Sequence, residues 1–151
     1  MRIYLWRHGQ AEPYRADDET RQLVTRGRED VNNIALTLTD ELSRIQRLLV
    51  SPYVRTRQTA AVIQPFLPTL TPQLSDWLTP DAQVQTAIDR LAELDDESVL
   101  LVTHQPLVGR LVEQLCGLAP GYIAMDTAAL ACVEADPVAA GLGELLWLKQ
   151  P

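Results

Sequence analysis

The chain has 151 residues, of which 46% are hydrophobic and 22% are charged. This size and composition predict one globular domain over residues 1–151 with a substantial buried core. The formal net charge of −7 argues against a nucleic-acid-binding protein. No apolar run approaches the roughly 18 residues of a membrane helix, and Arg7 interrupts the N-terminal apolar stretch too early for a signal peptide. We therefore expect a cytoplasmic monomer without nucleic-acid or membrane partners.

The placement of charges and cysteines along the chain indicates which kinds of binding site to expect. Residues 1–57 contain 10 Lys and Arg against 8 Asp and Glu, whereas residues 58–151 contain 3 against 12. The arginines are therefore concentrated toward the N-terminus, which keeps a local anion site open there. Cys116 and Cys132 lack the CxxC spacing typical of zinc sites, so neither a zinc site nor a disulfide framework is expected.

The first elements in chain order are a strand, a helix and a second strand. Residues 2–7 (RIYLWR) and 47–51 (RLLVS) predict the two strands. Between them, Thr25 is the expected N-cap of the helix. One face of this helix carries the apolar residues Val31, Ile34, Ala35, Leu38 and Leu42.

Prolines mark the boundaries of the next two predicted helices. Pro52 is expected in the first turn of one helix, and Pro65 is expected to end it. Thr79 and Pro80 are the expected cap and start of the following helix. Its apolar stripe comprises Val84, Ala87, Ile88, Leu91 and Leu94.

The remaining elements include the clearest strand of the chain. Residues 98–103 (SVLLVT) are continuously apolar apart from their ends and predict a buried strand. Pro106 is expected to open a helix that Gly117 closes. Residues 128–134 and 144–149 predict two strands joined by a Pro/Gly turn, the pattern of a hairpin.

Alternating strands and helices predict an α/β fold with a mostly parallel sheet covered on both faces. In such sheets ligands bind beyond the carboxyl ends of the strands. His8 follows the first strand and His104 follows the strand at 98–103, and the chain has no other histidine. The segment after the second strand carries Arg55 and Arg57. Three separate segments therefore deliver histidine and arginine to one edge of the sheet.

Two imidazoles beside several guanidiniums, without a carboxylate pair, indicate a phosphate site. Arginine binds phosphoryl groups through paired, charge-assisted hydrogen bonds, and histidine serves as nucleophile or acid–base group near neutral pH. Gly9 is expected to let the backbone approach the ligand closely. Considered alone, each histidine has a structural interpretation, as a satisfied polar group or a helix cap. Arg7 alone would be a charged residue at the sheet edge, and Arg57 a surface residue or a partner of a site residue. Because these residues are expected at one edge of the sheet, a functional site is favoured over separate structural roles.

Motifs of other enzyme classes are absent. The sequence contains no GxSxG elbow, no Walker A loop and no HExxH pattern. The glycines of GLGELL at 141–146 lack the third glycine of a dinucleotide-binding loop and lead into a strand, so they indicate a turn. Two histidines alone do not make a metal site, and we expect neither a metal nor a cofactor.

The RHG motif at 7–9, SPYVRTRQTA at 51–60 and VTHQP at 102–106 together resemble the histidine phosphatase (phosphoglycerate mutase-like) superfamily. The likeness extends from residue 3 to about residue 116. The short chain, LVTRGRED at 23–30 and VTHQPLVG at 102–109 are most similar to the SixA-type phosphohistidine phosphatases. The resemblance implies one histidine phosphatase domain with the phosphoglycerate mutase-like fold, a three-layer α/β/α sandwich.

The resemblance also implies roles for the site residues. His8 would be the nucleophile that forms a transient phosphohistidine, and Arg7 and Arg55 would hold the phosphoryl oxygens. His104 would donate a hydrogen bond to the phosphoryl group. Gly9 would also contact the substrate. Because cationic side chains supply the charge, no metal is needed.

Family members that cleave phosphate esters carry a mid-chain carboxylic acid that protonates the leaving oxygen. The corresponding segment here is LSDWLTPDAQ at 74–83. Asp76 is the better candidate for this general acid and Asp81 the lesser, since Asp81 has an alternative place in the first turn of a helix. Gln10 is a candidate substrate-binding residue, and Glu12 is a second candidate for lining the pocket.

We therefore expect a metal-independent hydrolase that dephosphorylates histidine in a signalling or phosphotransfer protein through a covalent phospho-His8 intermediate. The implied partners are phosphohistidine domains of phosphorelays or of the sugar phosphotransferase system. One alternative is a small-molecule phosphomonoesterase of the same superfamily, which needs a working acid such as Asp76. Another is a non-catalytic phosphoprotein-binding module, against which the presence of both His8 and His104 argues.

Overall fold

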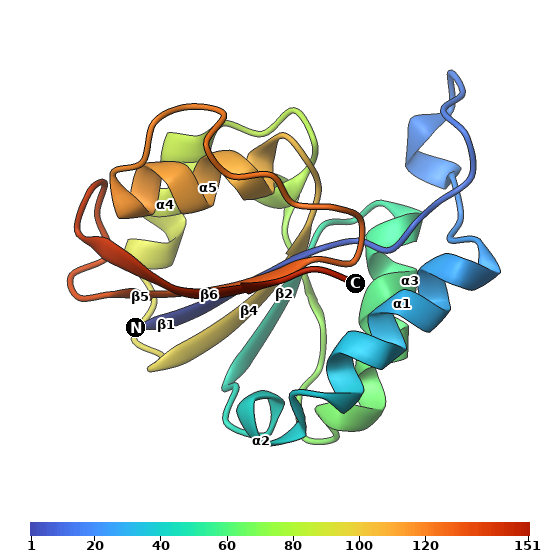
Figure 1. The fold of residues 1–151 in the computed structure, drawn as a ribbon, viewed down its shortest axis with the longest axis horizontal. Coiled ribbons are helices and arrows are strands. Elements are labelled where there is room, and N and C mark those ends of the chain that lie inside the picture. Colours follow the sequence, from blue (N-terminus) through green and yellow to red (C-terminus); the bar gives the residue numbers. More distant parts are fainter.

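The structure, a computed structural model, describes residues 1–151. Helices cover both faces of a six-stranded sheet with the strand order β3-β2-β4-β1-β5-β6 (Figure 1). The strands are β1 (Arg2–Arg7), β2 (Arg47–Val50), β3 (Gln73–Leu74), β4 (Ser98–Thr103), β5 (Leu130–Ala135) and β6 (Gly143–Lys149). The helices are α1 (Thr25–Leu36), α2 (Thr39–Leu42), α3 (Val54–Ile63), α4 (Val84–Ala92) and α5 (Leu107–Cys116), and the 3-10 turns are η1 (Asp18–Thr20), η2 (Gln64–Phe66) and η3 (Asp76–Leu78).

The strand register brings the predicted site residues to one edge of the sheet. Strands β1, β2, β3 and β4 pair in parallel, and β5 pairs antiparallel with β1 and with β6. Arg7 at the end of β1 lies beside Thr103 at the end of β4, and Val50 at the end of β2 lies beside Val102. Residues that follow these three strands therefore meet at the carboxyl edge, as the sequence predicts.

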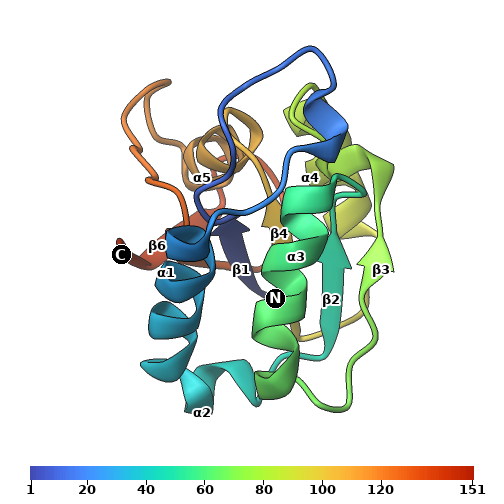
Figure 2. The ribbon, with the colours of Figure 1, turned by 90° about the vertical axis from the view of Figure 1, so that its right-hand side faces the viewer.

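Each face of the sheet has its own hydrophobic core. Alternation along β1 directs Ile3 and Leu5 into the core beneath α4 and α5, and Tyr4 and Trp6 into the core beneath α1 and α3. Figures 1 and 2 show the two helix layers on opposite faces, with α1 and α3 side by side in Figure 2. All six residues of β4 are buried, since a central parallel strand is covered on both sides. The predicted three-layer sandwich with a mostly parallel sheet is confirmed.

Several predicted helix boundaries are wrong. Helix α4 begins at Val84 rather than at Pro80, because buried Leu78 holds the preceding segment in η3, where its carbonyl oxygen accepts a hydrogen bond from Thr103 Oγ1 at 2.7 Å. Likewise, α3 begins at Val54, which leaves Pro52 outside the helix.

The first helix also differs from its prediction. Thr25 is its first residue and Val24 its N-cap, with no side-chain capping bond. Thr37 ends this helix by donating its hydroxyl to the carbonyl of Ile34 at 2.8 Å, so the residues up to Leu42 form the separate helix α2.

Other boundaries agree with the sequence. Gly117 ends α5 with a φ of 65°, a left-handed conformation that glycine adopts without strain. The hairpin of β5 and β6 is confirmed. Strand β3 was not predicted, because its two exposed residues carry no apolar periodicity. No helix combines the length and apolarity needed to cross a membrane.

Candidate active site

His8 is fixed at the end of β1 by backbone hydrogen bonds to both neighbouring segments. Its N–H donates to the carbonyl of Thr103 at 3.0 Å, and its own carbonyl accepts from the N–H of Ala128 at 2.9 Å. These bonds extend the sheet by one residue beyond β1, so the His8 side chain leaves a rigid backbone. Only 7% of His8 is exposed.

The hydrogen bonds of His8 define its tautomer. Nδ1 lies 2.7 Å from the carbonyl oxygen of Gly9, which can only accept, so Nδ1 carries the proton. Nε2 therefore presents a lone pair, toward which Arg55 Nε donates at 3.2 Å. Burial, followed by the charges of Arg55, Arg7 and Arg21, lowers the pKa of His8 to about 3. The ring is neutral at pH 7, and its Nε2 is available as a nucleophile.

His104 lies directly beside His8. The two ring centroids are 5.1 Å apart, with the ring planes inclined by 61°. His104 Nε2 lies 2.7 Å from Ser51 Oγ. Because this fully buried hydroxyl has no other acceptor, we assign it as donor to Nε2, which leaves the proton of His104 on Nδ1. Burial, followed by the repulsion that a protonated His104 would meet from a protonated His8 and from the site arginines, lowers the pKa of His104 to about 2.

Two buried nitrogens at this edge have no hydrogen-bond partner within the protein. They are His104 Nδ1 and Arg7 Nε, and no other buried side-chain nitrogen or oxygen lacks a partner. Arg7 is held by a bond from Nη1 to the carbonyl of Met125 at 2.7 Å, and burial lowers its pKa, although a guanidinium stays charged at neutral pH. Unpaired buried donors are rare and costly, so their coincidence here indicates an anion-binding site.

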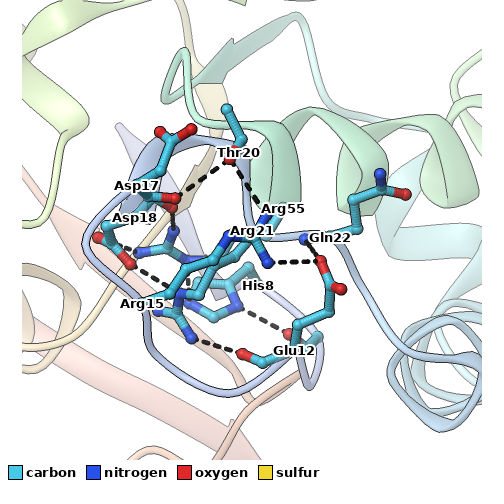
Figure 3. Close-up of polar contacts among 10 residues, drawn as sticks. His8, Glu12, Arg15, Asp17, Asp18, Thr20, Arg21, Gln22 and Arg55 are labelled. Atoms are coloured by element: carbon cyan, nitrogen blue, oxygen red, sulfur yellow. Dashed lines mark hydrogen bonds and ion pairs between the residues drawn. The ribbon is translucent and has the colours of Figure 1, made fainter.

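Arg55 comes from the first turn of α3 and is 3% exposed. Its Nη1 donates to the backbone carbonyl of Asp18 at 2.8 Å, and its Nη2 donates to the Asp18 carboxylate at 3.2 Å (Figure 3). Tyr53 packs against both Arg55 and His104, with its ring centre 5.1 Å from the guanidinium carbon and 5.1 Å from the imidazole centre. The structure thus brings His8, Arg7, Arg55 and His104 together, as the sequence predicts.

Gly9 packs closely against another segment of the chain. Its N–H donates to Thr59 Oγ1 at 3.1 Å. A Cβ atom on Gly9 would lie 2.5 Å from the carbonyl oxygen of Gly27 and 3.1 Å from a methyl group of Val31. Tight packing of the chain against the start of α1 gives a structural reason for glycine at this position, and contact of Gly9 with the ligand stays a prediction.

Gln10 and Glu12 lie in the loop that follows the RHG motif. Gln10 is exposed, and only its backbone carbonyl is bonded, to the N–H of Val24 at 3.0 Å. Glu12 accepts from the N–H of Gln22 at 2.7 Å and from Arg15 at 3.3 Å, so it shapes its own loop (Figure 3). Neither side chain is hydrogen-bonded to the histidines, and the role of Gln10 in substrate binding stays a prediction.

The mid-chain carboxylates are exposed. Asp76 begins η3, and no hydrogen bond or ion pair connects its carboxylate to the site. Asp81 accepts a bond from Thr79 Oγ1 at 2.9 Å and lies in a turn rather than in the first turn of α4. Arg57 is also exposed and makes no side-chain hydrogen bond. The role of Asp76 as a general acid therefore stays a prediction without structural support.

Sequence reasoning missed four residues around the site: Asp18, Arg21, Ser51 and Tyr53. Ser51 could have been found, because it directly follows a strand at the same edge as His8. Asp18 and Arg21 lie in a loop whose polar sequence is typical of an exposed surface segment and gives no signal of a site. No group of three or more His, Cys, Asp or Glu side chains has the arrangement of a metal site. Arg55, Arg7 and Arg21 place positive charge near His8.

A neutral imidazole with an unprotonated Nε2, beside unpaired donors and guanidiniums, can bind a tetrahedral oxyanion and attack its central atom. This combination, at the carboxyl edge of an α/β/α sandwich, defines a phosphoryl-transfer enzyme of the histidine type. The family model of the Histidine phosphatase superfamily (branch 1) matches residues 3–80. The chain belongs to this superfamily.

Similar proteins show which kind of histidine phosphatase the chain resembles. The chain is 35% identical to the phosphohistidine phosphatase SixA of Escherichia coli K12, across the whole chain and 94% of that protein. It is 38% identical to a SixA homolog of Haemophilus influenzae, across 78% of each. A solved structure of the protein histidine phosphatase SixA with tungstate superposes with a TM-score of 0.87 at 34% identity, covering 100% of this chain and 97% of that one. The predicted SixA-type likeness and phosphoglycerate mutase-like fold are confirmed.

Proposed function

We propose that the protein is a phosphohistidine phosphatase that removes the phosphoryl group from a histidine of another protein. The observation that carries the proposal is the pair of unpaired buried donors, Arg7 Nε and His104 Nδ1, beside the unprotonated Nε2 of His8. Three fixed groups then converge on one tetrahedral anion. The similarity to SixA proteins, one of which binds tungstate, supports this reading.

In the first step His8 Nε2 attacks the phosphorus atom in line with the P–N bond of the substrate. The new Nε2–P bond forms while the substrate P–N bond breaks, and the substrate imidazole leaves with the electron pair. If that ring carries a proton on its other nitrogen, it departs as a neutral imidazole and needs no strong acid. The donors of Arg7, His104 and Arg55 stabilise the equatorial oxygens.

In the second step water hydrolyses phospho-His8. The water oxygen bonds to phosphorus, the Nε2–P bond breaks, and Nε2 recovers its lone pair. The His8 Nδ1–H···O=C bond to Gly9 keeps the ring in one tautomer throughout. The released phosphate keeps both protons of the water and then equilibrates with solvent. Each step exchanges one bond to phosphorus for another, and the cationic side chains supply the stabilising charge.

The setting of this activity is part of the proposal. A phosphotransfer domain of a phosphorelay or a protein of the sugar phosphotransferase system would present the phosphohistidine on its surface. We place the enzyme in the cytoplasm, where such partners act, and propose that residues 1–151 work as a monomeric histidine phosphatase domain. One sheet with strands from Arg2 to Lys149 supports the domain assignment.

The test compares turnover of a phosphohistidine protein with turnover of p-nitrophenyl phosphate and sugar phosphates. We expect the phosphohistidine protein to react faster, because an alkoxide leaving group usually needs a positioned acid. If Asp76 contributes to ester cleavage, Asp76→Asn lowers the ester rates more than the phosphohistidine rate. Efficient and strongly preferred hydrolysis of one small ester by the wild type would instead favour a phosphomonoesterase.

A further inference from the structure

Asp18 lies between two arginines of the site. Its Oδ1 accepts from Arg21 Nε at 2.7 Å, and its Oδ2 accepts from Arg55 Nη2 at 3.2 Å. Figure 3 shows the three side chains grouped above His8. Asp18 and Arg21 are three residues apart across η1, and Arg21 also donates Nη1 to the carbonyl of Glu12 at 2.7 Å. The turn therefore holds the Asp18 carboxylate from one side and presents it to Arg55 on the other.

The contacts of Asp18 occupy one particular edge of the Arg55 guanidinium. Nη1 and Nη2, the end of the fork, both bind Asp18, one through the backbone carbonyl and one through the carboxylate. Nε is on the opposite side and points at His8 Nε2. A guanidinium also has a side edge, formed by Nε and the second hydrogen of Nη2, that can bind an oxyanion through two parallel bonds. With the end edge occupied, this side edge is directed toward the nucleophile, and its Nε–H, which donates to His8 Nε2 here, is released to a phosphoryl oxygen once Nε2 bonds to phosphorus.

Because Arg55 is buried, a negatively charged partner such as Asp18 helps to keep its guanidinium ionised. Burial lowers the pKa of Arg55, and the charge of Asp18 opposes this effect. For Asp18 itself, burial raises the pKa, but hydrogen bonds and charges of Arg21 and Arg55 outweigh it, so the pKa is lowered overall. Both groups are therefore ionised at neutral pH. A long side chain that is 3% exposed and fixed by a charged partner has little freedom to change its orientation.

We propose that Asp18 is a positioning residue that acts through Arg55, with Arg21 holding Asp18 in place. This inference rests on the proposed function, since it assigns Arg55 to the phosphoryl oxygens. Asp18 fixes the guanidinium so that its Nε–Nη2 edge meets the phosphoryl group attached to His8 or about to attach there. The alternative reading, that the Asp18 carboxylate competes with the phosphoryl group for Arg55, predicts effects of opposite sign.

The experiment measures tungstate affinity and turnover of a phosphohistidine protein for Asp18→Asn. Asp17→Asn is the matched control, because it removes the same charge from an adjacent exposed residue whose carboxylate makes no contact with Arg55. We expect Asp18→Asn to weaken tungstate binding and to lower kcat, each by about tenfold, the usual size for loss of a charged hydrogen bond. Asp17→Asn should stay within about twofold. No residue of η1 is buried, so the fold should be kept, which thermal unfolding verifies.

A double-mutant cycle with Arg55→Ala separates positioning from a general structural effect. If Asp18 acts through Arg55, Asp18→Asn has almost no further effect on tungstate affinity once Arg55 is alanine. Additive losses, or tighter tungstate binding in Asp18→Asn, would overturn the proposal. Wild-type turnover is measured in the same series. A wild type that leaves the phosphohistidine protein untouched refutes the proposed function, whereas the tungstate measurements still decide the role of Asp18.

Discussion

Replacing Arg55 by lysine keeps the positive charge but removes the planar guanidinium. In the structure this group makes three donor contacts at once, to His8 Nε2 at 3.2 Å and to the Asp18 carbonyl and carboxylate at 2.8 and 3.2 Å. An ammonium is a point donor and cannot keep the pairing with Asp18 while presenting two parallel N–H groups to an oxyanion. Arg55→Lys is therefore expected to lose at least one phosphoryl contact.

The magnitude follows from the value of one such contact. A hydrogen bond to a charged group contributes about 1.5–3 kcal/mol, and each 1.36 kcal/mol corresponds to a tenfold change in rate. We therefore expect Arg55→Lys to lower kcat/KM for a phosphohistidine protein by about 10- to 100-fold. Affinity for tungstate should fall in parallel, because the same edge binds the oxyanion.

Arg57→Lys provides the matched control for this change. Arg57 lies in the same helix, two residues further on, but it is exposed and makes no side-chain hydrogen bond. Its replacement should alter kcat/KM by less than about threefold. Phosphate release from the phosphohistidine protein, measured for both variants and the wild type, gives the comparison. Equal losses at the two positions would refute the assignment of Arg55 to the phosphoryl group.

The remaining predictions concern the histidines and metals. His8→Ala should retain less than about a hundredth of wild-type turnover, because removing a nucleophile costs several powers of ten; a higher residual rate contradicts its role. NMR titration of the two histidines should show both rings neutral from pH 8 to about 5, because their lowered pKa values of about 3 and about 2 lie far below 6.5. The unfolded chain protonates both near pH 6.5, so the free energy of unfolding should decrease as the pH falls below that value, by up to about 1.4 kcal/mol per pH unit for each ring. A normal titration near 6.5 would contradict the description of the site. Activity should survive dialysis against EDTA, and a loss restored by Zn²⁺ or Mg²⁺ would reopen a metal mechanism.

The placement of the two histidines was predictable because it depends on local pattern and on one rule of topology. The run from 98 to 103, apolar apart from its ends, is typical of a buried strand or helix segment, and its length favours the strand. Residues that follow parallel strands meet at one edge. His8 and His104 therefore come together in any fold that keeps these strands parallel and adjacent, and β1 and β4 are neighbours in the sheet.

The loop that positions Arg55 was not predictable in this way. Asp18 meets Arg55 across 37 positions of sequence, through a turn whose conformation depends on bonds such as that from Arg21 to the carbonyl of Glu12. The hydrophobic periodicity of the sequence does not predict such a long-range polar contact. The start of α4 was misjudged for a related reason: capping signals at Thr79 and Pro80 are local, whereas the burial of Leu78 is a tertiary effect that overrides them.

The central claim is that the phosphoryl group passes through Nε2 of His8. The most direct measurement is a rapid-quench experiment with a phosphohistidine protein carrying labelled phosphate, followed by peptide mapping of the enzyme. We predict a transient enzyme label that is stable in alkali and labile in acid, that maps to the peptide containing His8 and that is absent in His8→Ala. Release of labelled phosphate without any labelled enzyme, or a label on His104, would contradict it.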